Sequence, residues 1–567
     1  MELEQFEMVA VVAVLIIVAA SYFAKKLGLA TPILLVLVGL GLSLVPGMPP
    51  IAPEPGLILA VVLPPLLYSA AVNMPVMDFR RDLRTIGALS VVLVLVSAFA
   101  IGGVLWWIFP DLNFAAAVAV GAVVSPPDAV AATSIGKRLG LPPRLLTILE
   151  GEGLVNDATA LVLLRTAVAA TAGAFSFREA AGDFVYAVVV AVLVGVAVGF
   201  LAVRIRSKID QPALTTAISF VVPFIAFLPA ELADASGVLA VVAAGLVTGA
   251  MGVRRLSVQD RNAERTNWLT VQLLLENGVF LLMGLQLVTL VDDVENVGLS
   301  VWNAVWIGLA LTVVLGIVRA GFVIPLVLTA RARRSDHEER ARRFGEILEH
   351  VSEDERFQQH PRGPRIRRWL QRHHADARFY AGNGLGWRGG AVLAWSGMRG
   401  VVTLAAAQSL PTDFPYRTQL ILVAFVVALV TLVGQGSTLP LLIRVLGVRG
   451  TDEEQAQREL SLLLTELGEA AVGQVLENPD LRRRDGTPFD PTVIERAQTM
   501  YAKLTDRGGS ESEDDPVRAQ YPELMELLFD AQQDTLNHAR STGTYDSHTI
   551  ARAQKRLDEG NVRLKSL

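Results

Sequence analysis

The chain alternates between long apolar runs and short polar connections over most of its length. Each run has roughly 17–25 residues, the length that a helix needs to cross the hydrocarbon core of a membrane. Helices are expected, because open strands leave backbone groups unsatisfied in lipid. The pattern predicts thirteen transmembrane helices, near residues 8–24, 30–46, 55–73, 84–109, 113–136, 144–171, 182–203, 213–231, 236–253, 266–290, 299–330, 386–411 and 418–446.

Two long polar segments stand apart from these runs. Residues 331–385 hold 13 arginines against 9 acidic residues and contain five of the seven histidines. Residues 451–567 hold 23 acidic and 14 basic residues, with short apolar stripes typical of amphipathic helices. We therefore predict a transmembrane domain over residues 1–450, with residues 331–385 as a charged insertion, and a helical tail over residues 451–567.

The charges of the connections predict an orientation. Basic residues concentrate on the cytoplasmic side of a membrane. They follow the odd-numbered helices here, whereas the connections after even-numbered helices are mostly acidic. The basic connections contain Lys25 and Lys26; Arg80, Arg81 and Arg84; Lys137, Arg138 and Arg144; Arg204, Arg206 and Lys208; Arg254, Arg255 and Arg261; and Arg331, Arg333 and Arg334. We expect the amino end outside, and the carboxyl end, the insertion and the tail in the cytoplasm.

Composition supports this interpretation and excludes several classes of site. Hydrophobic residues make up 52% of the chain and charged residues 19%, whereas a soluble domain usually has about a quarter charged. The absence of cysteine excludes disulfides, thiolate metal sites and cysteine nucleophiles. Glutamates precede the first apolar run and Lys25 and Lys26 follow it, the reverse of a signal peptide, so we expect a retained helix.

Few charged groups lie within the apolar runs. Each is unfavourable by roughly 2.5–3.5 kcal/mol at the centre of a membrane helix and is therefore a functional candidate. They are Asp128, Glu150, Glu152, Asp157, Arg165, Glu276, Arg319 and Arg399. None of them is a histidine or a lysine, so a proton carried through the membrane must be held by a carboxylate.

Asp128 follows Ser125-Pro126-Pro127 in the fifth run. Two consecutive prolines remove two backbone donors and disfavour helix at the residue before them, so this helix should unwind. Unwound backbone at membrane depth persists where it is buried in protein or lines a cavity. Free carbonyls beside a carboxylate suit a small hard cation. The simpler interpretation is a proline kink with Asp128 as a helix cap.

The sixth run carries Glu152, Asn156 and Asp157. Spacings of four and five residues place the three side chains on nearly the same face of a helix. Three polar residues within six positions of an apolar run are hard to explain by packing. They indicate ion or proton binding, and a satisfied polar network without a transport role is the alternative.

Arg319 and Arg399 stay charged at any relevant pH. Each should need a carboxylate partner, and Glu152 is the natural choice for at least one of them. We expect a structural role for both arginines. Glu150 and Arg165 should lie near the membrane interface. The histidines of the insertion titrate near neutral pH and could sense cytoplasmic acidity, although a solvated charged loop is the commoner role.

Five segments resemble motifs of the monovalent cation/proton antiporters. The similarity is to the electroneutral branch, which includes bacterial and archaeal sodium/proton antiporters and eukaryotic sodium/proton exchangers, and it covers residues 8–447. The segments are Leu63-Pro-Pro-Leu-Leu-Tyr-Ser-Ala-Ala, Ser125-Pro-Pro-Asp, Gly151-Glu-Gly-Leu-Val-Asn-Asp, Asn277-Gly-Val-Phe-Leu-Leu-Met-Gly-Leu-Gln-Leu and Ser396-Gly-Met-Arg-Gly.

This resemblance implies an all-α fold with inverted six-helix repeats, unwound crossing helices at the fifth and twelfth positions, a homodimer and alternating access. By the same resemblance, Asp157 binds the ion and Asp128 lies opposite it. Asn156 occupies the place where electrogenic relatives keep a second carboxylate. The position of Glu152 is structural and pairs with an arginine, for which Arg319 is the first choice and Arg399 the second.

Three departures from the family pattern concern ligands of the ion. Ser69 stands in the third helix where many relatives have an acidic residue, and it is an accessory candidate. Gly153 replaces a frequent serine. Pro127 replaces the usual threonine before Asp128, although its carbonyl remains available to an ion. The choice between Na⁺ and K⁺ at Asp157 and Asp128 therefore stays open.

The sequence thus predicts a secondary antiporter of a bacterial inner membrane, not an enzyme, that exchanges Na⁺, or K⁺ or Li⁺, for H⁺ one for one and serves pH and cation homeostasis. We expect no cofactor, no nucleic acid partner, contact with membrane lipids and a homodimer. One alternative is a cation sensor or channel gated by the tail. An intramembrane aspartyl protease is disfavoured, because Asp128 and Asp157 lack its Gly-x-Gly-Asp signature.

Overall fold

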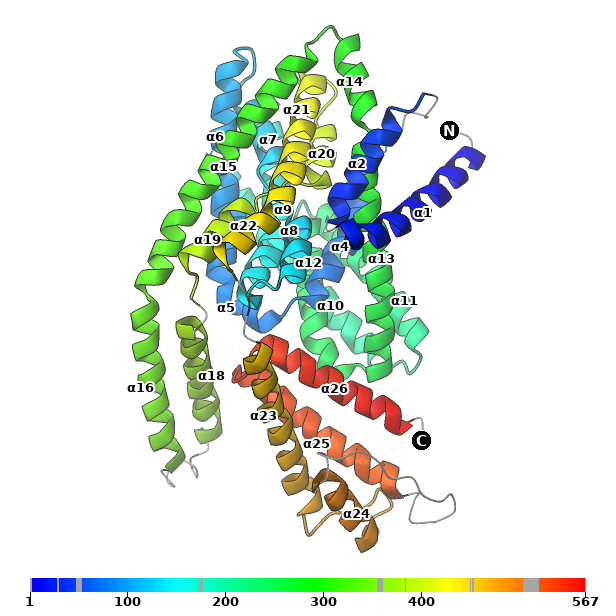
Figure 1. The fold of residues 1–567 in the computed structure, drawn as a ribbon, viewed down its shortest axis with the longest axis vertical. Coiled ribbons are helices and arrows are strands. Elements are labelled where there is room, and N and C mark those ends of the chain that lie inside the picture. Colours follow the sequence, from blue (N-terminus) through cyan, green and yellow to red (C-terminus); the bar gives the residue numbers. More distant parts are fainter. Residues whose placement is uncertain are drawn as a thin grey trace. The chain divides into compact units, whose positions relative to one another are not determined.

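The computed structural model describes residues 3–27, 30–46, 54–172, 177–353, 360, 362–382, 384–448, 450, 453–502 and 520–565. These residues form helices and connections, with a single isolated β-bridge between Arg482 and Pro488. The chain divides into two units (Figure 1). Unit 1 comprises Met1–Ala332 and Leu385–Gly450, and unit 2 comprises Arg333–Gly384 and Thr451–Leu567. The prediction of an all-α chain is confirmed.

Unit 1 contains the apolar helices and three π-helical turns within them. In chain order these are α1 (Leu3–Leu27), α2 (Thr31–Ser43), α3 (Pro55–Leu57), η1 (Ile58–Val62), α4 (Leu63–Asn73), α5 (Val76–Gly87), η2 (Ala88–Val92), α6 (Leu93–Ile108), α7 (Phe114–Val124), α8 (Ala129–Leu139), α9 (Pro143–Ala172), α10 (Phe177–Arg206), α11 (Pro212–Leu232), α12 (Gly237–Arg255), α13 (Val258–Leu285), α14 (Leu287–Asn296), α15 (Val301–Ala332), α19 (Trp387–Trp395), α20 (Val401–Gln408), α21 (Arg417–Val430), η3 (Thr431–Gln435) and α22 (Gly436–Leu446).

Within the described residues, nine helical segments are long and apolar enough to cross a membrane. Three shorter apolar helices cover Met8–Ala24, Thr31–Ser43 and Ile58–Asn73. The predicted run at 386–411 is divided between the short helices α19 and α20. By length and composition, these helices fit a chain that crosses a membrane several times.

Two of the apolar runs are broken in the middle. After α7 ends at Val124, residues 125–128 are not helical, because Pro126 and Pro127 cannot continue the hydrogen-bond ladder. Helix α8 then begins with Asp128 as its N-cap, whose side chain accepts from Val130 N at 2.8 Å. A second interruption at residues 396–400 separates α19 from α20. Both interruptions lie where the sequence predicts unwinding.

The fourth run begins earlier than its apolar residues suggest. Helix α5 starts at Val76, before the predicted boundary at residue 84, and continues through η2 into α6. Its first turns are amphipathic, and they bury Asp78 beside Arg81 and Asp82 against Arg144 of α9. These ion pairs stabilise polar turns that hydropathy alone assigns to a connection.

Small residues allow the helices to approach closely. Gly39 of α2 faces Gly284 of α13, and Gly121 of α7 faces the carbonyl of Ala98 in α6. At both glycines an added Cβ would overlap the neighbouring backbone. Glycines at helix interfaces are the usual means of close packing between membrane helices. They place α2 against α13 and α6 against α7.

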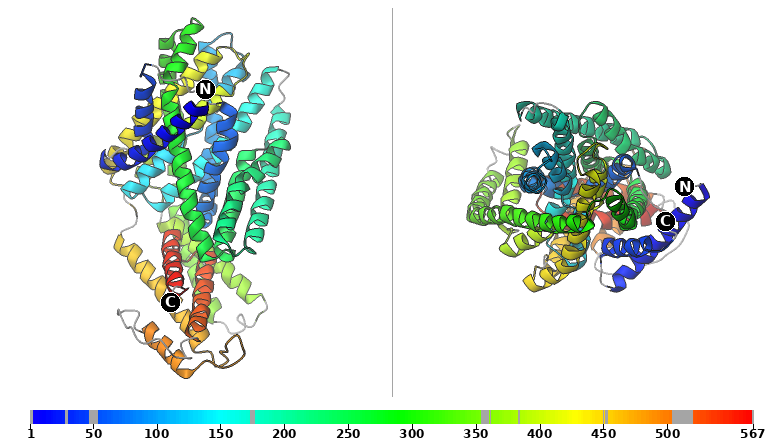
Figure 2. Two further views of the ribbon diagram at one scale, coloured as in Figure 1. Left: turned by 90° about the vertical axis from the view of Figure 1, so that its right-hand side faces the viewer. Right: turned by 90° about the horizontal axis from the view of Figure 1, so that it is seen from above.

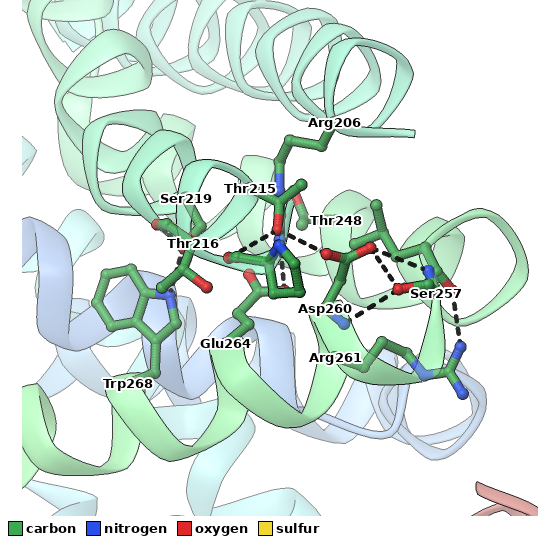
Figure 3. Close-up of polar contacts among 12 residues, drawn as sticks. Arg206, Thr215, Thr216, Ser219, Thr248, Ser257, Asp260, Arg261, Glu264 and Trp268 are labelled. Atoms are coloured by element: carbon green, nitrogen blue, oxygen red, sulfur yellow. Dashed lines mark hydrogen bonds and ion pairs between the residues drawn. The ribbon is translucent and has the colours of Figure 1, made fainter. Parts of the chain in front are cut away.

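A second group of helices surrounds α12. Helices α10 and α11 pack on α12, which also packs on α4, and α11 packs on α13 (Figure 2). A buried polar cluster joins this group (Figure 3). Arg206 of α10 binds Glu264 of α13 at 2.6 Å, and Thr215 of α11 donates to Asp260 of α13 at 2.9 Å. The cluster therefore links three helices at one end of the bundle.

Unit 2 combines a helical hairpin with the helices of the tail. The hairpin consists of α16 (Arg334–Glu353) and α18 (Gly363–Gly382), and His337 stacks on Tyr380 across it. The tail contains α23 (Glu453–Ala471), η4 (Val472–Leu476), α24 (Pro491–Ala502), α25 (Tyr521–Thr542) and α26 (Ser547–Lys565). Its small core includes Leu524 and Leu528 of α25.

Candidate functional site

The two unwound segments meet inside unit 1. The backbone N–H of Asp128 donates to the carbonyl of Met398 at 2.6 Å. Gly400 lies against the Asp128 carboxylate, and a Cβ at this glycine would overlap Oδ2. Helices α7, α20 and α21 pack together around the crossing (Figure 1). The crossing thus brings residues that are about 270 positions apart in the sequence into direct contact.

Arg399 binds the backbone carbonyls at the end of α7. Its Nε donates to Val124 O at 3.0 Å, Nη2 donates to Ser125 O at 3.2 Å, and Nη1 donates to Gly397 O. Its own backbone N–H donates to Thr431 Oγ1 at 2.9 Å. Carbonyls at a helix carboxyl end carry partial negative charge and lack intrahelical donors. The buried guanidinium therefore satisfies two carbonyls that have no helical donor because α7 ends there.

Asn156 connects α9 to the first unwound segment. Its Nδ2 donates to the carbonyl of Pro127 at 2.6 Å. Its Oδ1 is buried and has no hydrogen-bond partner in the described part of the chain. A buried acceptor without a partner is rare, and this oxygen is available to a donor or to a cation. One turn earlier, Gly153 lies against Ala129, which lets α9 approach the start of α8.

Among the described residues, Asp157 is the only ionisable one that lines a small pocket between α7, α9 and α20. The remaining lining residues are apolar: Ala122, Val123, Pro126, Ala160, Leu161, Leu164, Val402 and Ala406. Asp157 and Asp128 are both half-buried, and they lie close enough to interact electrostatically. The structure therefore places the two predicted aspartates and Asn156 at one site.

The two aspartates differ from Glu150 and Glu152 in their partners. Glu150 binds Lys137 at 2.7 Å, and Glu152 binds Arg319 at 2.5 Å. Among the described residues, neither Asp128 nor Asp157 forms an ion pair. A carboxylate in apolar surroundings without a basic partner is stabilised by taking up a proton or a cation. This chemistry is available at Asp128 and Asp157.

Glu152 and Arg319 form a bidentate pair away from solvent. Arg319 Nη1 lies 2.5 Å from Oε1 and Nη2 lies 2.8 Å from Oε2, and both side chains are almost fully buried. Arg319 Nε also donates to Leu393 O at 3.1 Å. Arg399 was expected to need a carboxylate, but its hydrogen-bond partners are carbonyls and a threonine hydroxyl. The freed backbone of α7 explains this difference.

The accessory candidate Ser69 lies on α4 and faces α13. Its hydroxyl donates to Gln272 Oε1 at 3.2 Å, and Gln272 Nε2 donates to Glu276 Oε2 at 3.1 Å. The hydrogen bonds described for Ser69 connect it to this pair and to Asn73 of its own helix, not to the aspartates. Ser69 therefore belongs to a separate polar chain across the α4–α13 contact.

Several contacts at the site could not be identified from residue types. Met398 contributes a carbonyl, Gly400 contributes the absence of a side chain, and Val402 contributes an apolar wall. None of these roles carries a chemical signature in sequence. Gln272 could have been identified from the sequence as a neighbour of Glu276, because it precedes Glu276 by four residues and therefore lies on the same side of α13.

Comparisons with known proteins are consistent with this geometry. The sequence profile described as the transmembrane sodium/hydrogen exchanger matches residues 11–445. An uncharacterized Na(+)/H(+) exchanger of Mycobacterium tuberculosis is 30% identical over 478 residues, which cover 82% of this chain and 79% of the relative. The sodium, potassium, lithium and rubidium/H(+) antiporter of Bacillus pumilus is 32% identical over 300 residues, which cover 51% of this chain and 44% of that protein.

A solved structure shares the fold. The sodium proton antiporter MjNhaP1 from Methanocaldococcus jannaschii at pH 8 aligns with a TM-score of 0.56 and 16% sequence identity. The alignment covers 79% of this chain and all of the antiporter chain. At this identity the match shows a common fold.

Proposed function

Because the chain belongs to the sodium/hydrogen exchanger family, a family of transporters and not of enzymes, we propose that it is a secondary antiporter exchanging a monovalent cation for protons. The family predicted from the five motifs is confirmed. Family and apolar helices together make the chain a multi-pass membrane protein.

The observation that carries this proposal is the environment of Asp157. Its carboxylate lines a pocket with apolar walls, close to Asp128 and without an ion-pair partner in the described structure. The neighbouring Asn156 leaves a buried amide oxygen unpartnered. A carboxylate with nearby neutral oxygens can hold one proton or one partly dehydrated cation, but not both. Competition for one site is the chemical basis of exchange.

Stoichiometry follows from the number of carboxylates that change occupancy. Asn156 carries no charge and holds the Pro127 carbonyl instead. Asp157 then alternates between proton and cation, with Asp128 as its partner at the site. One proton moves for each cation, and the exchange is electroneutral. Movement of the site between the two membrane faces proceeds when Asp157 is neutralised, because a bare carboxylate is costly in an apolar passage.

The membrane arrangement completes the proposal. The chain crosses the bacterial inner membrane thirteen times as two inverted repeats, with the amino end outside and the insertion and tail in the cytoplasm. The loop charges and the two unwound crossings support this arrangement. The protein works as a homodimer surrounded by lipid, without a cofactor or nucleic acid. It contributes to pH and cation homeostasis.

Purified protein in liposomes tests the proposed exchange. An outward or inward gradient of Na⁺, K⁺ or Li⁺ is imposed, and proton movement is followed with an internal pH-sensitive dye. The B. pumilus relative is named for transport of several alkali cations, so the three ions are compared side by side. Asp157→Asn should abolish cation-driven proton movement. Retained exchange in this variant would exclude Asp157 as the carrier.

Two further measurements test the stoichiometry and the alternative function. An imposed membrane potential should drive no net proton accumulation if exchange is one for one. A variant ending at residue 450 distinguishes transport from the alternative of a cation sensor or channel gated by the tail. Exchange by the truncated chain supports an antiporter whose membrane unit is sufficient. Uncoupled cation flux through it would support the channel.

A further inference from the structure

Glu276 is a third carboxylate in the apolar runs without an ion-pair partner. It lies in the second half of α13 and is half-buried. The ion pairs of the described residues include Glu150, Glu152 and Glu264 but not Glu276. A charged group within an apolar run is energetically unfavourable, so its presence indicates a functional role. The proposed exchange at Asp157 gives Glu276 no role.

A chain of hydrogen bonds across two helices holds Glu276 in position. Gln272, one turn earlier on α13, donates to Glu276 Oε2 at 3.1 Å. The hydroxyl of Ser69 on α4 donates to Gln272 Oε1 at 3.2 Å. Among the described residues Glu276 Oε1 accepts no hydrogen bond, so one carboxylate oxygen is free. The free Oε1 of Glu276 is a ligand suited to a hard cation, and the hydrogen bonds through Gln272 and Ser69 hold the carboxylate in place.

The position of Glu276 relates it to the exchange site. Helix α13 packs on α4 and on α20, and Val402 and Ala406 of α20 line the Asp157 pocket. The helix that carries Glu276 is therefore a direct neighbour of a helix that forms the exchange site.

From these contacts we propose that Glu276, positioned by Gln272 and Ser69, forms an accessory site for a monovalent cation beside the exchange site at Asp157. The inference rests on the proposed function and adds a second place where the transported cation binds. The negative charge of Glu276 raises the local concentration of cations beside the exchange site. The cation is released to Asp157 when that carboxylate loses its proton.

The test compares Glu276→Gln with the unchanged protein in liposomes. The substitution keeps shape and hydrogen-bonding capacity but removes the charge. The apparent KM for the transported cation should rise about fivefold, as expected for loss of a nearby partly screened charge. The maximal rate should stay within about twofold, because Asp157 still carries the ion. An unchanged KM would overturn the proposal.

Two variants provide controls. Glu150→Gln removes the charge of another carboxylate in the apolar runs, one that is already paired with Lys137. The apparent KM of this variant should not change. Ser69→Ala removes only the hydroxyl that donates to Gln272, and it should raise the apparent KM by a smaller factor than Glu276→Gln. A larger effect at Ser69 than at Glu276 would also contradict the proposal.

A binding measurement separates failure of the inference from failure of the proposed function. Cation-dependent thermal stabilisation of the purified protein in detergent requires no transport. Glu276→Gln should need about fivefold more Na⁺, K⁺ or Li⁺ for the same stabilisation. If the unchanged protein does not exchange ions, the proposed function fails and this titration still decides the site. If the unchanged protein exchanges ions, and Glu276→Gln alters neither the apparent KM nor the cation concentration needed for stabilisation, only the accessory site fails.

Discussion

Gly400 touches the carboxylate of Asp128, and the contact leaves no space for a side chain at position 400. The two residues come from opposite unwound segments of the crossing. The absence of a Cβ therefore sets how closely the second segment approaches the first. The carboxylate also accepts from Val130 N, so it cannot turn aside without losing its own helix cap.

Gly400→Ala should lower cation-driven proton exchange by about tenfold or more, because a displaced carboxylate loses the geometry of the site. Initial rates in liposomes measure the effect. Gly316→Ala is the matched control, since a Cβ there meets nothing within 4 Å, and its rate should match the unchanged protein. Equal rates in both variants would show that the contact with Asp128 has no functional weight.

Arg399→Lys should reduce exchange by about tenfold. Lysine keeps the charge but cannot contact Val124 O, Ser125 O and Gly397 O together, as the guanidinium does. Carbonyls of the broken helix would then lose their donors and the site would shift. The control is Arg388→Lys, because Arg388 is exposed. Normal exchange in Arg399→Lys would mean that charge alone is required.

Glu152→Gln should destabilise unit 1 by about 3–5 kcal/mol, because it leaves the buried guanidinium of Arg319 without its counter-ion. Thermal unfolding in detergent gives the change. Glu150→Gln breaks the Lys137 pair instead, whose lysine side chain is 64% exposed, and should lower stability by at most about 1 kcal/mol. A similar loss in both variants would contradict the difference in burial.

The buried cluster of α10 to α13 provides an independent stability test. Arg206 is fully buried, and Glu264 is its carboxylate partner (Figure 3). Glu264→Gln should lower the stability by about 3–5 kcal/mol. Replacing both partners, as in Arg206→Met with Glu264→Leu, should recover much of this loss, because no charge is then left unpaired. Greater loss in the double variant would indicate that the pair is required for packing.

The hairpin of α16 and α18 should weaken in acid. Burial of the ring, and then the nearby charge of Arg378, lowers the pKa of His374 below its usual range. The unfolded state therefore binds the proton more tightly than the folded state. Stability contributed by neutral His374 is complete above the unfolded pKa of about 6.5 and is lost as the pH falls toward the folded pKa.

Hydrogen exchange of residues 363–382 in the full chain measures this effect. Protection, corrected for intrinsic exchange, should be lower at acidic than at neutral pH. His374→Gln should remove that part of the dependence, because glutamine does not titrate. A dependence that persists unchanged in the variant would assign the effect to other groups of unit 2.

Sequence was informative where a residue type determines the backbone. Pro126 and Pro127 predict the first interruption, and the family resemblance implies the second. The family motifs identify Asp128, Asn156 and Asp157 as parts of one site. The helical spacing from Glu152 also places Asn156 and Asp157 on nearly the same face of one helix. Partners made of backbone could not be predicted, since a carbonyl at Val124 or Met398 has no signature in the sequence.

Two other features were missed for related reasons. Arg206 was counted among the basic connections, but it lies inside the bundle and binds Glu264. Helix α5 begins before the apolar run because the ion pair between Asp82 and Arg144 stabilises its polar first turns. In both cases a distant partner overrides local hydropathy, and hydropathy describes only local preference.

The backbone hydrogen bond from Asp128 to Met398 and the hydrogen bonds from Arg399 to the last carbonyls of α7 hold the two unwound segments together. The four half-helices of the crossing cannot slide past one another without breaking these contacts together. In the proposed exchange, a displacement that opens Asp157 to the other membrane face would therefore move the crossing as one rigid unit. The sliding would take place along the surfaces between this unit and the surrounding helices, and the surroundings of the bound ion would keep their shape.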